Sequence, residues 1–198
     1  MRWHQRRMKA DAKGTRYFLP LPWRWRDVAA LVPWILLGLS KNAVTGEFDE
    51  YAIKAAYLYN FAKFVEWPTA SFADAQAPLT ICVAGNSPFG SALEAVAGKR
   101  VAAHPVEVRY LPTPTRIEQC HIAFLSRTEQ PRLKPLLAQL AGRPVLTVSD
   151  ISDFAQGGGM IGLVEAEQRI HFNINLDAAR QADLKLSSQL LKLATIVD

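Results

Sequence analysis

Short apolar segments alternate with segments of helical pattern along most of this 198-residue chain, and this alternation limits its possible folds more than any other feature. The strand-like segments are residues 79–84, 100–102, 106–110, 121–125, 145–148, 160–164 and 169–176. The helical segments are residues 48–66, 88–96, 131–140 and 177–196. Helical crossovers between short buried strands are typical of a mostly parallel sheet whose two faces are both covered.

The predicted fold class is therefore α/β, a three-layer sandwich with a mostly parallel sheet and helices on both of its faces. The strict alternation in residues 169–176, with Ile170, Phe172 and Ile174 on one side, predicts the second strand of a C-terminal antiparallel hairpin. Residues 165–168 are its expected turn. A closing helix is expected over residues 177–196, because alanines and leucines recur there at steps of three and four.

The first 46 residues differ from the rest in charge and hydropathy. They hold nine Lys and Arg against two Asp and Glu, whereas residues 47–198 hold 14 basic and 16 acidic residues. A basic stretch precedes an apolar run at residues 28–39, which is shorter than the roughly 20 residues of a membrane span. We therefore predict a signal peptide at residues 1–46 and an exported, periplasmic domain at residues 47–198. The alternative is an uncleaved N-terminal anchor.

The exported domain shows no sign of nucleic-acid binding or catalysis. Its slight acidic excess disfavours nucleic acid as a partner. The glycines of residues 157–162 fit a dinucleotide-binding pattern, but a strand and not a helix follows them. His104, His121 and His171 each stand alone, without neighbours at metal-ligand spacing. We predict no catalytic residues, no metal and no cofactor; an exported enzyme of unknown chemistry is the alternative.

Two cysteines, Cys82 and Cys120, lie in strand-like segments of the predicted exported domain. An exported protein meets an oxidising compartment, so an even number of cysteines permits a disulfide. Neighbouring strands could bring the two within bridging distance. The alternative is a pair of buried free thiols that pack as small hydrophobic side chains.

The first predicted helix carries six aromatic side chains between residues 48 and 64, which is more than one buried face usually needs. A broad core face is the commoner explanation, and the alternative is that part of this surface contacts a second subunit or another protein. A glycine-rich loop near residues 154–160 is a second expected contact, because apolar residues beside glycines can adapt to a surface. The expected contact residues are Tyr57, Tyr59, Phe61, Phe64, Trp67, Phe154 and Met160.

Three parts of the sequence resemble a known family when they are taken together. They are KAAYLYNFAKFVEWP at residues 54–68, the pair ICVAG at 81–85 and CHIAFLS at 120–126, and the long segment at 157–194. The last is the most specific, because a glycine run, a hairpin, an FNIN strand and an SSQLL segment follow in one order. This combination resembles the YfiR family of bacterial periplasmic proteins over about residues 50–198.

The resemblance implies a non-catalytic periplasmic α/β domain that tends to form homodimers. The best-understood members inhibit a membrane-bound diguanylate cyclase by binding its periplasmic domain, which lowers cyclic di-GMP and restrains biofilm formation. Some members are joined to sensor kinases. The alternative function is thus a periplasmic small-molecule or redox sensor subunit coupled to a sensor kinase or another membrane signalling protein. A small ligand would enter the mouth of the sheet near residues 85–88.

The resemblance also bears on the cysteines. Members of the family can carry two disulfides that respond to periplasmic redox state, and Cys82 and Cys120 match the positions of one pair. The second pair would fall within residues 145–159, where this sequence has no cysteine. Any redox response of this protein is therefore expected to depend on Cys82 and Cys120 alone.

Overall fold

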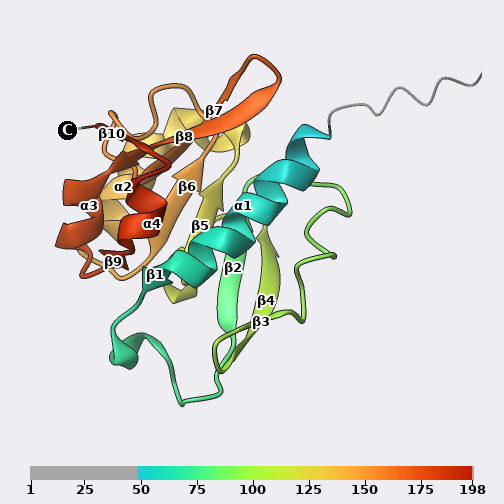
Figure 1. Ribbon diagram of the computed structural model, residues 1–198, viewed down its shortest axis with the longest axis vertical. Helices are drawn as coiled ribbons and strands as arrows, with labels where there is room; N and C mark the ends of the chain where they lie inside the picture. Colours follow the sequence, from blue (N-terminus) through green and yellow to red (C-terminus); the bar gives the residue numbers. More distant parts are fainter. Residues whose placement is uncertain (1–48, 198) are drawn as a thin grey trace, which may run out of the picture. The chain divides into compact units, whose positions relative to one another are not determined.

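The computed structural model describes residues 49–197, and the predicted signal peptide at residues 1–46 lies outside them. An eight-stranded sheet runs through the described domain (Figure 1). Its strands are β2 (Leu79–Ala84), β3 (Arg100–Val101), β4 (His104–Leu111), β5 (Ile122–Leu125), β6 (Leu146–Ser149), β7 (Ile161–Ala166), β8 (Arg169–Asn175) and β10 (Thr195–Val197). A second sheet pairs β1 (Val65–Glu66) with β9 (Lys185–Leu186) in antiparallel orientation.

The helices of the described residues differ widely in length. The α-helices are α1 (Glu50–Phe64), α2 (Leu133–Leu140), α3 (Leu176–Gln181) and α4 (Ser188–Leu191). Short 3-10 helices are η1 (Thr69–Ser71), η2 (Ile117–Gln119) and η3 (Arg127–Arg132). Between residues 49 and 197, no helix combines the length and the apolar character that crossing a bilayer requires.

Five neighbouring strands of the large sheet are parallel, in the order β4-β2-β5-β6-β7. β8 is antiparallel to β7, and β10 pairs with β8 at the outer edge. The mostly parallel α/β sandwich predicted from the sequence is confirmed. The chain moves outward from β2 to β4 and then crosses back to β5. The sheet therefore has a topological switch point between β2 and β5.

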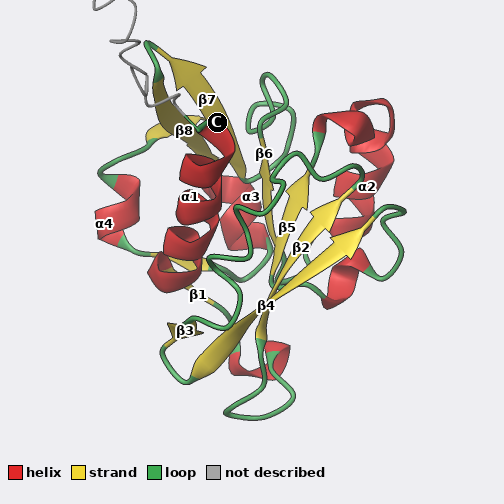
Figure 2. Cartoon of the chain, turned by 90° about the vertical axis from the view of Figure 1, so that its right-hand side faces the viewer, coloured by secondary structure: helices red, strands yellow, loops and turns green. Residues whose placement is uncertain are grey.

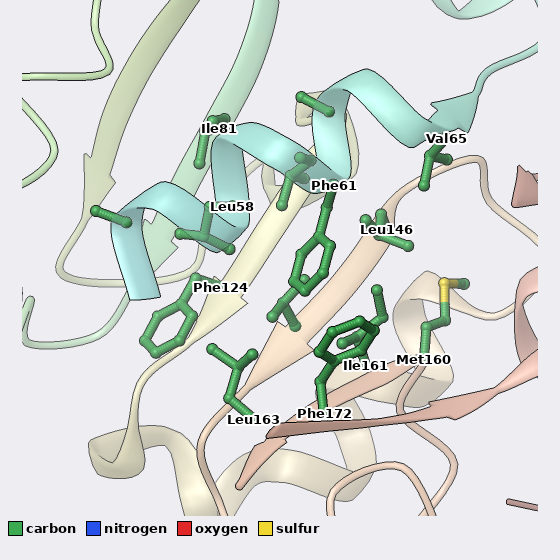
Figure 3. Close-up of a cluster of buried hydrophobic side chains, with 14 of the residues drawn as sticks. Leu58, Phe61, Val65, Ile81, Phe124, Leu146, Met160, Ile161, Leu163 and Phe172 are labelled. Atoms are coloured by element: carbon green, nitrogen blue, oxygen red, sulfur yellow. The ribbon is translucent and has the colours of Figure 1, made fainter. Parts of the chain in front are cut away.

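The sheet separates two hydrophobic cores of different size. The larger core lies under α1, α3 and α4, on the face where Phe61 of α1 meets Phe172 of β8 with ring centroids 5.3 Å apart. Figure 3 shows Phe61 and Leu58 reaching from α1 toward the strands that carry Phe124 and Leu146. The smaller core lies under α2, which Figure 2 shows on the opposite side of the sheet from α1.

The ends of α1 follow from local sequence. Asp49 precedes the helix, and its carboxylate accepts a hydrogen bond from the amide of Ala52 at 3.0 Å, which satisfies one of the free donors of the first turn. The helix ends at Phe64, two residues before its predicted end at residue 66, and the Trp67-Pro68 pair that follows prevents its continuation, because a residue before proline is disfavoured in helical geometry. α1 therefore has nearly the bounds that the sequence pattern indicates.

The prediction of one closing helix over residues 177–196 is wrong. The structure divides this segment into α3, β9, α4 and β10. Asp183 adopts a left-handed backbone with φ of +56°, which stops α3, and Ser187 then caps α4 by accepting a hydrogen bond from the amide of Leu190 at 3.2 Å. The leucine stripe misled the prediction because only part of it is buried. Leu193 is 74% exposed.

Two smaller predictions also need correction. In place of the helix predicted at residues 88–96, residues 90–98 form successive turns, in which backbone amides donate hydrogen bonds to the carbonyl three residues back, as Ala92 does to Phe89 at 2.8 Å. The predicted hairpin forms, but its turn is shorter than expected. Glu167 and Gln168 alone occupy it, both with positive φ, as a tight two-residue turn requires.

Candidate functional site

The carboxyl ends of β2, β5 and β6 lie side by side at the switch point, where folds of this kind commonly bind ligands. Gly85 follows β2, Ser126 follows β5 and Asp150 follows β6. Their alignment follows from the register of the three strands, whose last residues are paired. We call this side of the sheet the carboxyl edge.

A buried lysine connects α1 to the carboxyl edge. Lys54 is 1% exposed, and its Nζ lies 2.6 Å from Oδ2 of Asp150 and also contacts the carboxylate of Glu50, one turn earlier in α1. Arg127 adds a second cation 3.2 Å from the same Asp150 oxygen. Buried charges require such compensation, and here two carboxylates balance two cations. These four residues, the ionic cluster, fasten the first turns of α1 to the end of β6.

Tyr51 completes the environment of Asp150. Its hydroxyl donates a hydrogen bond to Oδ2 of Asp150 at 3.0 Å. Burial, followed by the negative charge of Asp150, raises the pKa of Tyr51 to about 12. The hydroxyl therefore keeps its proton near neutral pH and acts as a donor, so the shifted pKa serves the attachment of α1 and indicates no general base.

Polar side chains fill the space directly over Gly85. This residue has φ of +82°, and a Cβ at its position would collide with the side chains of Ser126, Thr128 and Glu129. The hydroxyls of Ser126 and Thr128 lie 2.7 Å apart. The mouth of the sheet near residues 85–88, expected as a ligand entrance, is thus closed at Gly85.

The opposite side of the sheet, the amino edge, carries three stacked rings from three different segments. Phe72 lies between His104, which begins β4, and His121, which precedes β5. The ring centroid of Phe72 is 3.9 Å from that of His104 and 4.4 Å from that of His121, with the planes nearly parallel. The Trp67 indole donates to the main-chain oxygen of His121 at 3.2 Å. The ring stack, Phe72 with His104 and His121, holds residues 67–77 against the sheet.

His121 is held in its neutral form. Its Nδ1 accepts a hydrogen bond from the amide of Thr80 at 3.0 Å, so the ring proton sits on Nε2 and is donated to the carbonyl of Ser71 at 3.1 Å. Burial is the main cause that lowers the pKa of His121, and the nearby His104 and Arg109 act in the same direction. Among the residues the structure describes, no three His, Cys, Asp or Glu side chains gather as a metal-binding group.

The two cysteines form a disulfide in the structure. Cys82 lies in β2 and Cys120 lies two residues before the first residue of β5, with Cα atoms 5.9 Å apart. The parallel pairing of these neighbouring strands brings the two residues together, and both are buried in the smaller core. The bond therefore joins the two strands that flank the switch point.

Three of the residues expected in a contact surface lie in the core. Phe61, Phe154 and Met160 are 0%, 1% and 5% exposed, and Figure 3 shows Phe61 and Met160 among the buried side chains. Side chains with so little surface offer no area to a partner, which corrects their expected role. A Phe61→Ala substitution therefore reports on stability and not on association.

The other four expected contact residues remain partly exposed on or after α1. They are Tyr57, Tyr59, Phe64 and Trp67. Tyr57 donates its hydroxyl to the carbonyl of Ile170 at 3.0 Å, and Tyr59 to the carbonyl of Arg100 at 3.1 Å. Each ring is thus fixed by a hydrogen bond while part of its face stays in solvent. A contact role for these four remains a prediction.

The ionic cluster was not predicted from the sequence, although the sequence contains one indication of it. Lys54 lies four residues before Leu58 on the apolar stripe of α1, so a charged residue occupies a position that faces the core. A lysine there requires a buried carboxylate partner. No pattern in the sequence shows that Asp150, 96 residues away, is that partner.

A comparison with known proteins identifies the family. Residues 51–195 match the protein family described as YfiR/HmsC-like. The matched stretch extends from the first turn of α1 to the start of β10. It contains the disulfide, the ring stack and three of the four residues of the ionic cluster. The family resemblance expected from the sequence is confirmed, and the chain belongs to the YfiR/HmsC-like family.

Proposed function

We propose that this protein is exported to the periplasm and inhibits a membrane-bound diguanylate cyclase by binding the periplasmic domain of that enzyme. Binding lowers cyclic di-GMP and so restrains biofilm formation. The observation that carries the proposal is the match to the YfiR/HmsC-like family over residues 51–195. A family of periplasmic, non-catalytic regulators is what the sequence resemblance implies, and the protein is proposed to act as a homodimer.

Inhibition by binding imposes a physical requirement. A regulator shifts the equilibrium of its target only by binding the inactive conformation more tightly than the active one. This requires a surface with strong, specific contacts, and partly exposed aromatic rings are enriched at such surfaces. Tyr57, Tyr59, Phe64 and Trp67 supply rings of this kind along α1, which supports a protein-binding role for that helix.

The test is the level of cyclic di-GMP in the native host with this gene intact and deleted. We expect the level to rise on deletion. Expression of the full chain should restore it, whereas a copy lacking residues 1–46 should not, because the latter stays in the cytoplasm. An unchanged level after deletion would contradict the proposal and would direct attention to another membrane receiver, such as a sensor kinase.

A second candidate function is small-molecule sensing, favoured by a pocket between α1 and β8. The pocket has a volume of about 450 Å³, with apolar walls that include Tyr57 and Phe172 and with Arg169 and His171 among its polar groups. Apolar walls with a few convergent polar groups are typical of ligand sites. The cation of Arg169 fits a carboxylate, and the apolar walls fit a small apolar body attached to it.

This candidate is tested on the purified exported domain. A ligand that binds the folded state raises the unfolding temperature in a concentration-dependent way. A panel of aromatic and aliphatic carboxylates should contain compounds that stabilise the wild-type protein and fail to stabilise Arg169→Ala. A panel without any stabilising compound would rule out this chemistry for the pocket.

A further inference from the structure

A second hollow, a groove, runs along another side of α1. It lies between α1 and the turns of residues 88–99 and has a volume of about 490 Å³. On the helix it extends from Asp49 to Asn60, which corresponds to a length of roughly 17 Å at 1.5 Å per residue. The groove is therefore elongated, with the length of about three helical turns.

Alanines contribute to both sides of this groove, together with larger side chains such as Tyr51, Tyr59 and Phe89. Ala52, Ala55 and Ala56 of α1 line one side, and Ala92 and Ala95 line the other. Ala52, Ala56 and Ala95 are exposed, so the groove is open along its length. Compact ligands are usually enclosed over most of their surface. An open trough lined with alanines instead permits close approach of a helix or an extended segment.

Two lysines lie near the Tyr59 end of the groove: Lys99 lines it, and Lys63 follows Asn60, the last lining residue of α1, by three residues. Lys63 and Lys99 each place Nζ 5.3 Å from the ring centroid of Tyr59, so two cations converge on one ring. Within residues 49–197, neither lysine has a carboxylate oxygen within 4.0 Å. Arg100, Arg116, Lys134, Arg143, Arg169, Lys185 and Lys192 also lack such a partner, so what distinguishes Lys63 and Lys99 is that both approach the same ring beside the groove. Like charges gathered beside an open surface attract negative charge.

We propose that this groove is the docking site for an acidic amphipathic segment of the regulated membrane protein's periplasmic domain. The segment places its apolar face on the alanines and its carboxylates near Lys63 and Lys99, while Tyr59 packs against it. This inference rests on the proposed function and adds to it the surface and the chemistry of the partner. Charge complementarity at the basic end selects a protein segment rich in Asp and Glu.

Two variants separate charge from shape. Lys63→Glu with Lys99→Glu reverses the basic end, and Ala56→Trp fills the groove without a change of charge. All three side chains are exposed, so the variants are expected to fold and to unfold within about 2 °C of the wild type. Lys134→Glu with Lys192→Glu is the matched control, since it makes the same change of charge at exposed positions outside the groove.

Each variant is expressed as the full chain in the deletion strain, and cyclic di-GMP is measured together with the unfolding temperature of the purified protein. We expect the charge-reversed and the groove-filled variants to leave cyclic di-GMP at the deletion level. The control and a Lys63→Arg, Lys99→Arg variant should restore the wild-type level, because they retain the groove and its charge.

The outcomes distinguish this inference from the proposed function. If deletion raises cyclic di-GMP and both groove variants still return it to the wild-type level, the docking site is refuted and the regulatory function stands. If deletion has no effect, the proposed function fails and the docking site fails with it. If light scattering shows that the charge-reversed variant changes its oligomeric state, the groove belongs to a contact between two copies of this chain, which also overturns the inference.

Discussion

At the carboxyl edge of the sheet α1 is held by buried charges, whereas at the amino edge the segment that follows α1 is held by stacked rings. The ionic cluster joins Lys54 of α1 to Asp150 after β6. The ring stack places Phe72 between His104 and His121. α1 and the segment that follows it are thus fastened to opposite edges of the sheet by different interactions, and the two fastenings should respond differently to mutation and pH.

The two edges differ in how much stability is lost when one interacting side chain is removed. A buried ion pair contributes little net stability, yet loss of one member is costly because it leaves the other charge buried without compensation. A ring stack contains no formal charge while His121 is neutral, so its loss costs only packing and hydrogen bonds. The carboxyl edge is thus the more sensitive to single substitutions, and the amino edge is the more sensitive to mild acid.

The largest effect is expected at the carboxyl edge. Asp150→Ala should reduce the free energy of unfolding by about 3–5 kcal/mol, because it leaves the buried Lys54 ammonium beside Arg127 with Glu50 as the only carboxylate. Urea unfolding followed by circular dichroism measures this change. Asp177→Asn, which breaks an exposed pair with Arg180, is the control and should change stability little.

A double replacement sharpens this result. Lys54→Met with Asp150→Leu removes both buried charges, while Glu50 and Arg127 keep contact with solvent. It should recover most of the stability that Asp150→Ala loses. Equal destabilisation by the double and the single replacement would mean that packing volume, and not uncompensated charge, dominates at this edge.

The disulfide lies between the two edges and should have the next largest effect. Cys82→Ala with Cys120→Ala opens a loop closed over a sequence separation of 38 residues. Chain entropy alone predicts a loss of about 4 kcal/mol, and measured losses are commonly about 2–4 kcal/mol. In urea unfolding, the reduced wild type and the variant should give coincident curves, and the oxidised wild type should unfold at higher urea. A reduced wild type as stable as the oxidised one would contradict this.

A smaller effect is expected at the ring stack. Phe72→Ala should cost about 1–3 kcal/mol, since it removes two stacked contacts from a partly exposed ring. It should also speed proteolytic cleavage within residues 67–77. Combined with Asp150→Ala, its effect on stability should add within about 0.5 kcal/mol if the edges are independent. A larger deviation would show that α1 couples them.

The smallest effect concerns pH. The pKa of His121 is lowered in the folded state, so the unfolded state binds more protons below its ordinary pKa of about 6.5. The contribution of His121 to stability is therefore fully present above that pH and decreases as the pH falls below it. Its slope cannot exceed about 1.4 kcal/mol per pH unit. Urea unfolding at pH 7.5, 6.5 and 5.5 measures this slope.

The control for the pH dependence is a pair of histidine substitutions. His121→Asn should flatten the loss of stability between pH 6.5 and 5.5, because it removes the group that takes up the extra proton in the unfolded state. His171→Asn, at an exposed position on β8, should leave the slope unchanged. The reverse pattern would assign the pH response to the surface and not to the amino edge.

Particular elements show where sequence patterns were sufficient. The bounds of α1 follow from the Asp49 cap and the Trp67-Pro68 pair, and the short apolar runs became the buried strands β2, β5 and β6. The prediction failed where similar leucine spacing was compatible with several structures. At residues 177–196 the left-handed Asp183 and the cap at Ser187 determine the breaks, and periodicity does not detect either.

The sequence by itself determined the α/β class with its mostly parallel sheet and the family, because these depend on local periodicity and on motifs that are contiguous in the chain. Only the tertiary structure decided that Lys54 meets Asp150, that Phe72 lies between two histidines, and that Phe61 and Met160 are core residues. The physical reason is that burial and pairing are properties of segments far apart in the sequence. The register of neighbouring strands brings those segments together, and no local pattern records that register.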